Sequence, residues 1–161
     1  MFGISIQTLL IRVLILLVAQ PVHEWAHAWS AYQLGDDTAS LQGRMTLNPV
    51  AHFDPIGSLL LVLQGFGWGK PVPINPYRMR VPPRIGAAIS AVAGPFSNFL
   101  LAMLLAIPFR LNLVGWGGQA LGGISLSMIL LVAIRLNLGL MLFNLLPVYP
   151  LDGEKALVGV L

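Results

Sequence analysis

Two histidines and a glutamate stand close together near the start of the chain, in the sequence His23-Glu24-Trp25-Ala26-His27. On an α-helix, residues four apart lie about 40° apart around the axis and roughly one turn along it, so both imidazoles can reach one metal ion. This is the H-E-x-x-H arrangement, with two zinc ligands and a glutamate that acts as a base. Zinc lowers the pKa of water to about 7, and Glu24 can take a water proton and pass it to a leaving amine.

The surroundings of this motif indicate a membrane protein. Hydrophobic residues make up 57% of the 161 residues and charged residues only 9%, whereas soluble domains carry about 25% charged residues. No charged residue occurs from 85 to 109 or from 111 to 134, and about 20 apolar residues suffice to cross a bilayer. Ionisable residues in an apolar span cost several kcal/mol and are functional by default. The motif therefore predicts a metal site rather than passive packing.

The expected fold is an all-α membrane protein with a core of three transmembrane helices, over about 4–34, 84–109 and 121–146. A long connection, 36–83, is rich in proline and glycine, which argues against standard helices there. Within it, the apolar stretch 56–66 is too short to span as a helix and is expected to form a re-entrant hairpin or an edge strand. A glycine-rich turn precedes the third span. The chain stops at Leu161, soon after the expected start of another helix, so a further C-terminal helix is expected to be cut short.

The distribution of basic residues predicts an orientation. The 36–84 region holds five Lys and Arg residues and the 110–121 connection holds one. Positive residues favour the cytoplasmic side, so loop 36–83 is expected in the cytoplasm, the N-terminus outside, and the active site toward the cytoplasmic face of a prokaryotic plasma membrane. The net charge of +3 then reflects anchoring of cytoplasmic loops at the lipid bilayer, and nucleic acid is not an expected partner.

A zinc site with two histidines is incomplete, because catalytic zinc normally takes three protein ligands. The chain has no cysteine, so the third ligand must be a carboxylate or another histidine. Asp152 follows the third span at the same depth as the histidines and can close the site from across the bundle, with Glu154 as the weaker rival. Asp36 and Asp37 follow the motif helix and suit a solvated cap; Asp54 is a further candidate.

Three motifs in this order and spacing resemble one protein family. They are 23–27, Gly-Pro-Phe-Ser-Asn at 94–98, and Asn-Leu-Leu-Pro-Val-Tyr-Pro-Leu-Asp-Gly at 144–153. Together they resemble the site-2 protease family of intramembrane zinc metalloproteases, and its short prokaryotic branch in particular. The stretches 47–57 and 68–73 also resemble that branch, so the resemblance covers nearly the whole chain.

The resemblance implies that residues 1–161 form a single polytopic membrane protease domain. It implies a zinc ion held by His23, His27 and Asp152, with Glu24 as the catalytic base. The implied activity is endopeptidase cleavage within or near transmembrane helices of membrane-anchored protein substrates, as in regulated intramembrane proteolysis. The chain departs from the family where Glu154-Lys155 replaces the usual Gly-Arg after Leu-Asp-Gly, and where it ends without the further helix that members commonly carry.

Several further residues have open roles. By the same resemblance, Asn98 and Asn144 would line the site and orient substrate or stabilise the oxyanion; the alternative is that they tie helices together by hydrogen bonds. His52 is either an extra ligand or outer-shell group, or a loop histidine hydrogen-bonded to Asp54, which is the favoured interpretation. Gly94 is expected to permit close helix packing.

Two other functions compete with proteolysis. In a zinc transporter the same three ligands would form a transit site, but transporter folds favour internal repeats, and no repeat is found in this sequence. A carrier would also not need Glu24 beside its ligands. The other alternative is a catalytically idle membrane scaffold that zinc stabilises.

Overall fold

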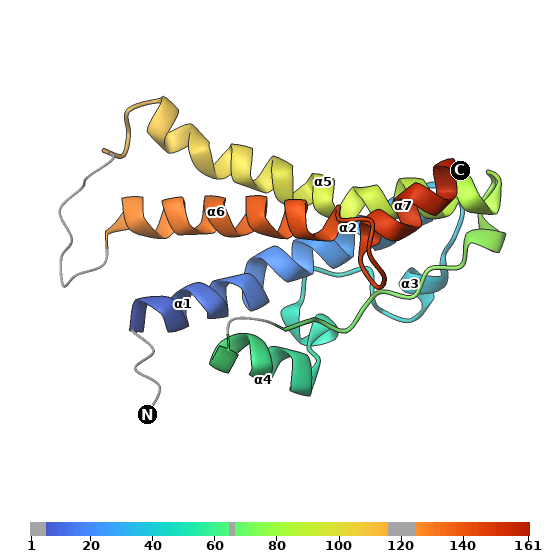
Figure 1. The fold of residues 1–161 in the computed structure, drawn as a ribbon, viewed down its shortest axis with the longest axis horizontal. Coiled ribbons are helices and arrows are strands. Elements are labelled where there is room, and N and C mark those ends of the chain that lie inside the picture. The colour runs from blue at the N-terminus through green and yellow to red at the C-terminus, as the bar shows by residue number, and fades with distance from the viewer. Residues whose placement is uncertain (1–5, 65–66, 116–124) are drawn as a thin grey trace.

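The computed structural model describes residues 6–64, 67–115 and 125–161, and every regular element in these ranges is helical (Figure 1). This confirms the all-α class for the described residues. The α-helices are α1 (Ile6–Leu14), α2 (Gln20–Gln33), α3 (Thr38–Leu41), α4 (Pro55–Gln64), α5 (Pro83–Arg110), α6 (Leu126–Asn144) and α7 (Asp152–Val160). A π-helical turn, Ile15–Ala19, joins α1 to α2, and short 3₁₀ turns occur at Pro49–His52 and Pro76–Arg78.

Helices α5 and α6 are long and apolar enough to cross a membrane. Their 28 and 19 residues correspond to about 42 and 28 Å of helix, against about 30 Å of hydrocarbon core. Only 28% of the most apolar stretch of α5 and 11% of that of α6 are buried within the protein. The core helix of a soluble protein would be mostly buried. Helices α5 and α6 agree with the predicted spans 84–109 and 121–146, although 121–124 lie outside the described residues.

The predicted first span, 4–34, is represented by α1, the π-helical turn and α2, which follow one another without a gap from Ile6 to Gln33. Residues 4 and 5 lie outside the described residues. The π turn divides this helical run into pieces, none of which reaches the length of a span by itself, so a third transmembrane helix stays a prediction. Small buried residues such as Ala28 and Ala31 let α2 pack closely against α5, as is common between helices in membranes.

The expected strand or β-hairpin over 56–66 is wrong for the described part of that segment, which is helix α4. Asp54 explains why the helix begins here, because its Oδ1 accepts a hydrogen bond from Gly57 N at 2.7 Å and caps the first turn. Pro55 is compatible with the first helical position, and the leucines that follow are good helix formers. Residues 65–66 lie outside the described part. The placement of α4 in a membrane stays a prediction.

An extended segment, 67–75, leads from α4 toward α5 and is fixed beside α2. Lys70 N donates to His52 O at 2.9 Å, while Arg44 Nη2 donates to Lys70 O at 2.7 Å. At its other end, Asn75 N donates to Asp36 Oδ2 at 2.6 Å. We call 67–75 the strap. Because it is held at both ends, its middle can act as a fixed wall for whatever lies beneath it.

Candidate metal centre

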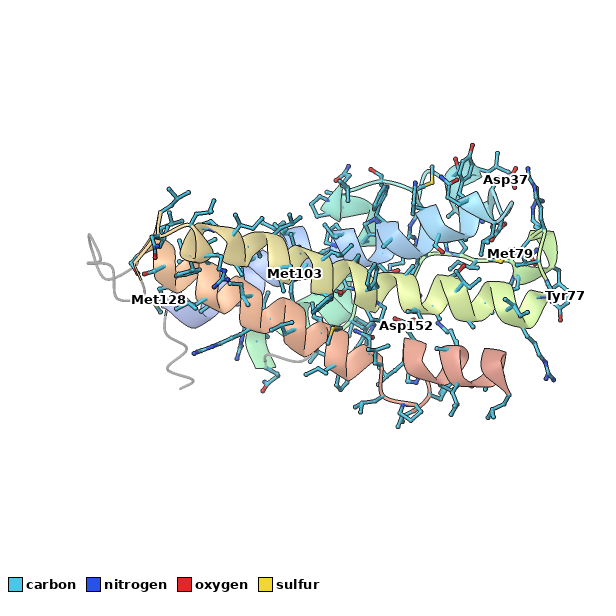
Figure 2. All side chains as sticks on the ribbon, turned by 90° about the horizontal axis from the view of Figure 1, so that it is seen from above. Asp37, Tyr77, Met79, Met103, Met128 and Asp152 are labelled. Carbon is cyan, nitrogen blue, oxygen red and sulfur yellow. The ribbon has the colours of Figure 1, made fainter. Side chains whose placement is uncertain are left out.

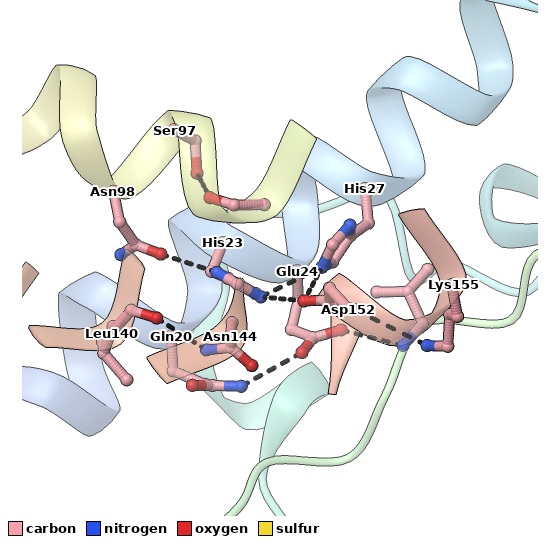
Figure 3. Close-up of polar contacts among 12 residues, drawn as sticks. Gln20, His23, Glu24, His27, Ser97, Asn98, Leu140, Asn144, Asp152 and Lys155 are labelled. Carbon is pink, nitrogen blue, oxygen red and sulfur yellow. Dashed lines mark hydrogen bonds and ion pairs between the residues drawn. The ribbon is translucent and has the colours of Figure 1, made fainter. Parts of the chain in front are cut away.

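Three side chains from distant parts of the chain meet at the centre of the molecule (Figure 3). His23 and His27 lie on α2, and Asp152 is the first residue of α7, which packs against α5. His23 Nε2 lies 3.0 Å from His27 Nε2, and each lies 3.1 Å from Asp152 Oδ2. All three residues are buried. Three donor atoms therefore form a nearly equilateral triangle.

The triangle matches what a zinc ion requires. Zinc takes histidine nitrogens and carboxylate oxygens at about 2.0–2.2 Å in tetrahedral geometry, which puts neighbouring donor atoms about 3.3–3.5 Å apart. The observed separations of 3.0–3.1 Å differ from that by a few tenths of an ångström. The donor chemistry also fits, because catalytic zinc sites use three protein ligands of this kind and keep a fourth position open. Among the described residues, His23, His27 and Asp152 are the group that could hold a metal ion.

The other nitrogen of each imidazole is held by an oxygen atom. His27 Nδ1 lies 2.7 Å from the backbone oxygen of Ser90, and His23 Nδ1 lies 2.6 Å from Asn98 Oδ1. A carbonyl oxygen only accepts, so Nδ1 must carry the proton in both rings, and Nε2 then presents a lone pair to the triangle. Metal-binding histidines are usually oriented in this way by an outer partner.

Glu24 faces the same cavity as His27 and Asp152. Its Oε1 accepts a hydrogen bond from Gln20 Nε2 at 3.0 Å, and its Oε2 accepts one from Val72 N at 2.9 Å. Val72 belongs to the strap, so a backbone N–H from a distant segment fixes the carboxylate. The cavity has a volume of about 220 Å³ and is lined by Glu24, His27, Pro71, Val72, Ile74, Pro76, Ala87, Ala91, Asp152 and Lys155. A carboxylate and two of the donors thus border one space that can hold water and a peptide group.

The electrostatics of the centre favour an ionised aspartate. Burial by itself raises the pKa of the Asp152 carboxyl. Imidazoles that carry a proton on Nε2 as well as on Nδ1 outweigh burial through hydrogen bonds and charge and hold that pKa below its usual range, and a metal ion takes the place of those Nε2 protons. Lys155 adds a positive charge, with its Nζ 3.5 Å from Asp152 Oδ1. An ionised carboxylate is the form that binds a metal cation.

The rival carboxylates have other partners or lie elsewhere. Asp36 is buried and accepts hydrogen bonds from Thr38 N and Asn75 N, and Asp37 pairs with Arg78. The metal-binding group found among the described residues contains none of these carboxylates, and it contains neither Asp54 nor Glu154.

The asparagines and the third histidine are placed as follows. Asn98 contacts His23, as described above, while Asn144 Nδ2 donates to the backbone oxygen of Leu140, in its own helix, at 3.0 Å. The interpretation that His52 bonds to Asp54 is wrong, because His52 Nε2 instead donates to Thr46 O at 2.8 Å. The Asp54 carboxylate is occupied in capping α4. His52 lies outside the group of three ligands, although its carbonyl helps to hold the strap.

Two contributors to the centre were not predicted from the sequence. The N–H of Val72 is a backbone group, so the type of its side chain carries no signal of this contact. Asn137, on α6, contacts Asn98 and is one of the few polar residues of an otherwise apolar helix. A polar residue inside an apolar span is the signal that could have identified it.

The fold and the centre together define a helical protein with membrane-spanning features and a buried His-His-Asp donor set beside a glutamate. Comparison with known proteins agrees with that class. A curated Bacillus subtilis protein named "Putative zinc metalloprotease YwhC" is 45% identical over 146 residues, which cover 89% of this chain and 65% of that protein. Proteins named "Putative zinc metalloprotease Rip2" from Mycobacterium tuberculosis and Mycolicibacterium smegmatis are 34% and 31% identical over 152 residues, covering 88% of this chain and 53% of each.

The chain is similar to these proteins over nearly nine-tenths of its own length, and its motifs resemble those of the site-2 proteases. It spans 65% of the length of YwhC and about half the length of the Rip2 proteins. No family model matches the chain, and no solved structure matches it.

Proposed function

We propose that this chain is a zinc-dependent intramembrane endopeptidase that cleaves membrane-anchored proteins within or near their transmembrane helices. The observation that carries the proposal is the triangle of His23 Nε2, His27 Nε2 and Asp152 Oδ2 with Glu24 on the same cavity. The names of the homologous proteins support zinc and proteolysis. The glutamate distinguishes this proposal from a transporter, because metal transit needs ligands but no base.

In this proposal His23, His27 and Asp152 hold the zinc ion. Zinc supplies a Lewis acid that makes water a stronger nucleophile and polarises a peptide carbonyl. Glu24 accepts a proton from the attacking water and donates it to the leaving amine, so that one water and one peptide bond become a carboxylate and an ammonium group. The hydrogen bonds from Gln20 and Val72 hold both carboxylate oxygens in place while the proton is transferred.

The exposed apolar side chains of α5 and the position of the basic loop support a placement in the membrane. Apolar side chains such as Phe96, Met103 and Leu104 of α5 are exposed on the protein, and a bilayer would cover them. Met128 and Met103 lie toward one end of the long axis, and Asp37 and Tyr77 at the other, with Asp152 between them (Figure 2). We assign the end with Asp37 and Tyr77, near the basic loop, to the cytoplasm. The centre then lies toward the cytoplasmic side, where water can reach it.

The test is the substitution Glu24→Gln in protein reconstituted with a transmembrane substrate. Glutamine keeps the size of the side chain but cannot accept the water proton, so cleavage is expected to fall at least 100-fold, the lower range for general base catalysis. Zinc content is expected to stay at that of the unmodified protein, because Glu24 is not a ligand. Unchanged cleavage by the variant would refute the mechanism. Zinc flux into vesicles without any cleavage by the unmodified protein would favour a transporter.

A further inference from the structure

A chain of buried side-chain hydrogen bonds runs from α6 to the metal centre. Asn137 Nδ2 donates to the backbone oxygen of Ala133 at 2.8 Å. Asn98 Nδ2, on α5, donates to Asn137 Oδ1 at 2.8 Å, and Asn98 Oδ1 lies 2.6 Å from His23 Nδ1, on α2. Asn137, Asn98 and His23 are only 0–3% exposed. Three helices are thus linked by one line of polar groups that ends on a ligand.

The direction of every hydrogen bond in this line follows from its first member. The carbonyl of Ala133 can only accept, so the amide nitrogen of Asn137 must face it and the amide oxygen must face Asn98. That oxygen can only accept, so Asn98 turns its own nitrogen toward Asn137 and its oxygen toward His23. The His23 Nδ1 must then carry the proton, and its Nε2 keeps a lone pair for the metal.

The two histidines differ in how this state is imposed. His27 Nδ1 donates to a backbone oxygen, that of Ser90, which no side-chain substitution removes. His23 depends on Asn98, whose amide would present a donor instead of an acceptor if it turned around. Two acceptors favour the observed orientation: Asn137 Oδ1 at 2.8 Å from Asn98 Nδ2 and, at the longer distance of 3.4 Å, the backbone oxygen of Ala19.

The surroundings make this contact hard to replace. Asn137 borders a cavity of about 160 Å³ between α1, the π turn, α5 and α6, and the other described residues that line it are apolar. Water is a poor substitute partner in such a cavity, because buried water needs two to four polar contacts. Without Asn137, Asn98 Nδ2 keeps only the longer hydrogen bond to Ala19 O. The loss of a partner by a buried amide is costly, so Asn98 is expected to be held less firmly against His23 when Asn137 is lost.

We infer that Asn137 is a positioning residue for the metal centre, which fixes the orientation of Asn98 and thereby the protonation of His23 at Nδ1. The inference rests on the proposed function in that the metal is taken to be zinc. The inference gives α6 a role at the metal centre, although none of the three ligands lies on that helix. It also assigns Asn98 to the orientation of a ligand, with both its amide oxygen and its amide nitrogen engaged in the resting structure.

The experiment measures the zinc affinity of the full chain in detergent or lipid by competition with a chelator of known affinity. Asn137→Leu has the same number and branching of side-chain heavy atoms but no polar group, and its zinc affinity is expected to fall about 10–100-fold, as when an outer partner of a ligand is removed. The matched control is Ser127→Ala. Ser127 lies on the same helix and is also buried, but its hydroxyl hydrogen-bonds to Ser125 rather than to the metal centre, and its zinc affinity is expected to stay unchanged.

Two further variants keep the test decisive. Asn137→Asp retains an acceptor oxygen toward Asn98, so its zinc affinity is expected to stay within about threefold of the parent protein. Where the leucine variant does not fold, Asn137→Ser takes its place: a serine hydroxyl can bond back to its own helix but is too short to reach Asn98, and the same loss is expected.

The outcomes separate this inference from the proposed function. A parent protein that binds no zinc would refute the proposed function. If the parent binds zinc and the folded Asn137→Leu or Asn137→Ser variant binds it equally well, the positioning role is refuted while the proposed function stands. A loss in the Ser127→Ala control as large as that at Asn137 would also refute it, because the effect would then belong to α6 in general.

Discussion

Glycine at position 94 is predicted to be indispensable for the metal centre. Gly94 lies on α5 directly opposite the two histidines of α2. A Cβ atom added there would lie 2.3 Å from His27 Nε2, 2.4 Å from His27 Cε1 and 2.7 Å from His23 Nε2. The first and third of these atoms are donors of the triangle. The substitution Gly94→Ala therefore places a methyl group on the metal-binding atoms themselves.

The size of the effect follows from these distances. Ordinary contact between such atoms begins at 3.4 Å, so the His27 ring or the α5 backbone must move by about 1.1 Å, whereas metal–ligand distances tolerate only about 0.2 Å. The ring cannot move that far and remain a ligand. We expect zinc affinity to fall on the order of 100-fold or more, since loss of an outer partner alone costs 10–100-fold. Substrate cleavage is expected to fall with it.

The assay combines the zinc content of the purified protein with competition by a chelator. Gly139→Ala, on α6, is the matched control, because a Cβ at Gly139 meets nothing within 4 Å and alanine is the better helix former by about 1 kcal/mol. Its zinc affinity is expected to equal that of the unmodified protein. If folded Gly94→Ala protein binds zinc as tightly as the unmodified protein, the close approach of α5 to the imidazoles is wrong.

Two further predictions concern Glu24 and Asp152. Val72→Pro removes the N–H that donates to Glu24 Oε2. A hydrogen bond to a charged group contributes about 1.5–3 kcal/mol, so cleavage by this variant is expected to fall about 10–100-fold at unchanged zinc content. The control Val72→Ala keeps the N–H and is expected to cleave normally. Equal activity of the two variants would show that the strap does not hold the base. Asp152→Ala removes one of three ligands and is expected to abolish zinc retention after dialysis. The control Lys155→Ala removes only the neighbouring charge and is expected to retain zinc. Full zinc content in Asp152→Ala would show that Asp152 is not a ligand.

The sequence predicts the structure well where the spacing of residues on a helix or the length of an apolar segment determines the geometry. The four-residue spacing of His23 and His27 predicts that both imidazoles share one side of a helix, and the structure brings them within 3.0 Å. The predicted spans 84–109 and 121–146 match the two long helices to within a few residues in their described parts. The sequence also favoured Asp152 over its rivals, and the structure brings it to both histidines.

The failures share a different cause. An apolar run of about 11 residues fits a strand or a short helix, and the capping bond from Asp54 to Gly57 N decides between them only once the turn has formed. The partner of His52 is a backbone oxygen, and the group that holds Glu24 is a backbone N–H. Backbone groups are the same at every position, so side-chain patterns do not reveal which of them a buried polar side chain meets.

The distance along the chain between the ligands has a consequence for biosynthesis. His27 and Asp152 are 125 residues apart, and at about 5–20 residues per second a ribosome needs about 6–25 s to get from one to the other. During that interval the nascent chain carries the histidines and the glutamate but lacks the aspartate. The newly made protein therefore cannot assemble its full donor set until α6 has been made and the chain has turned back toward α2. A site of the proposed kind therefore forms late, because binding by all three ligands must wait until Asp152 has joined the two histidines.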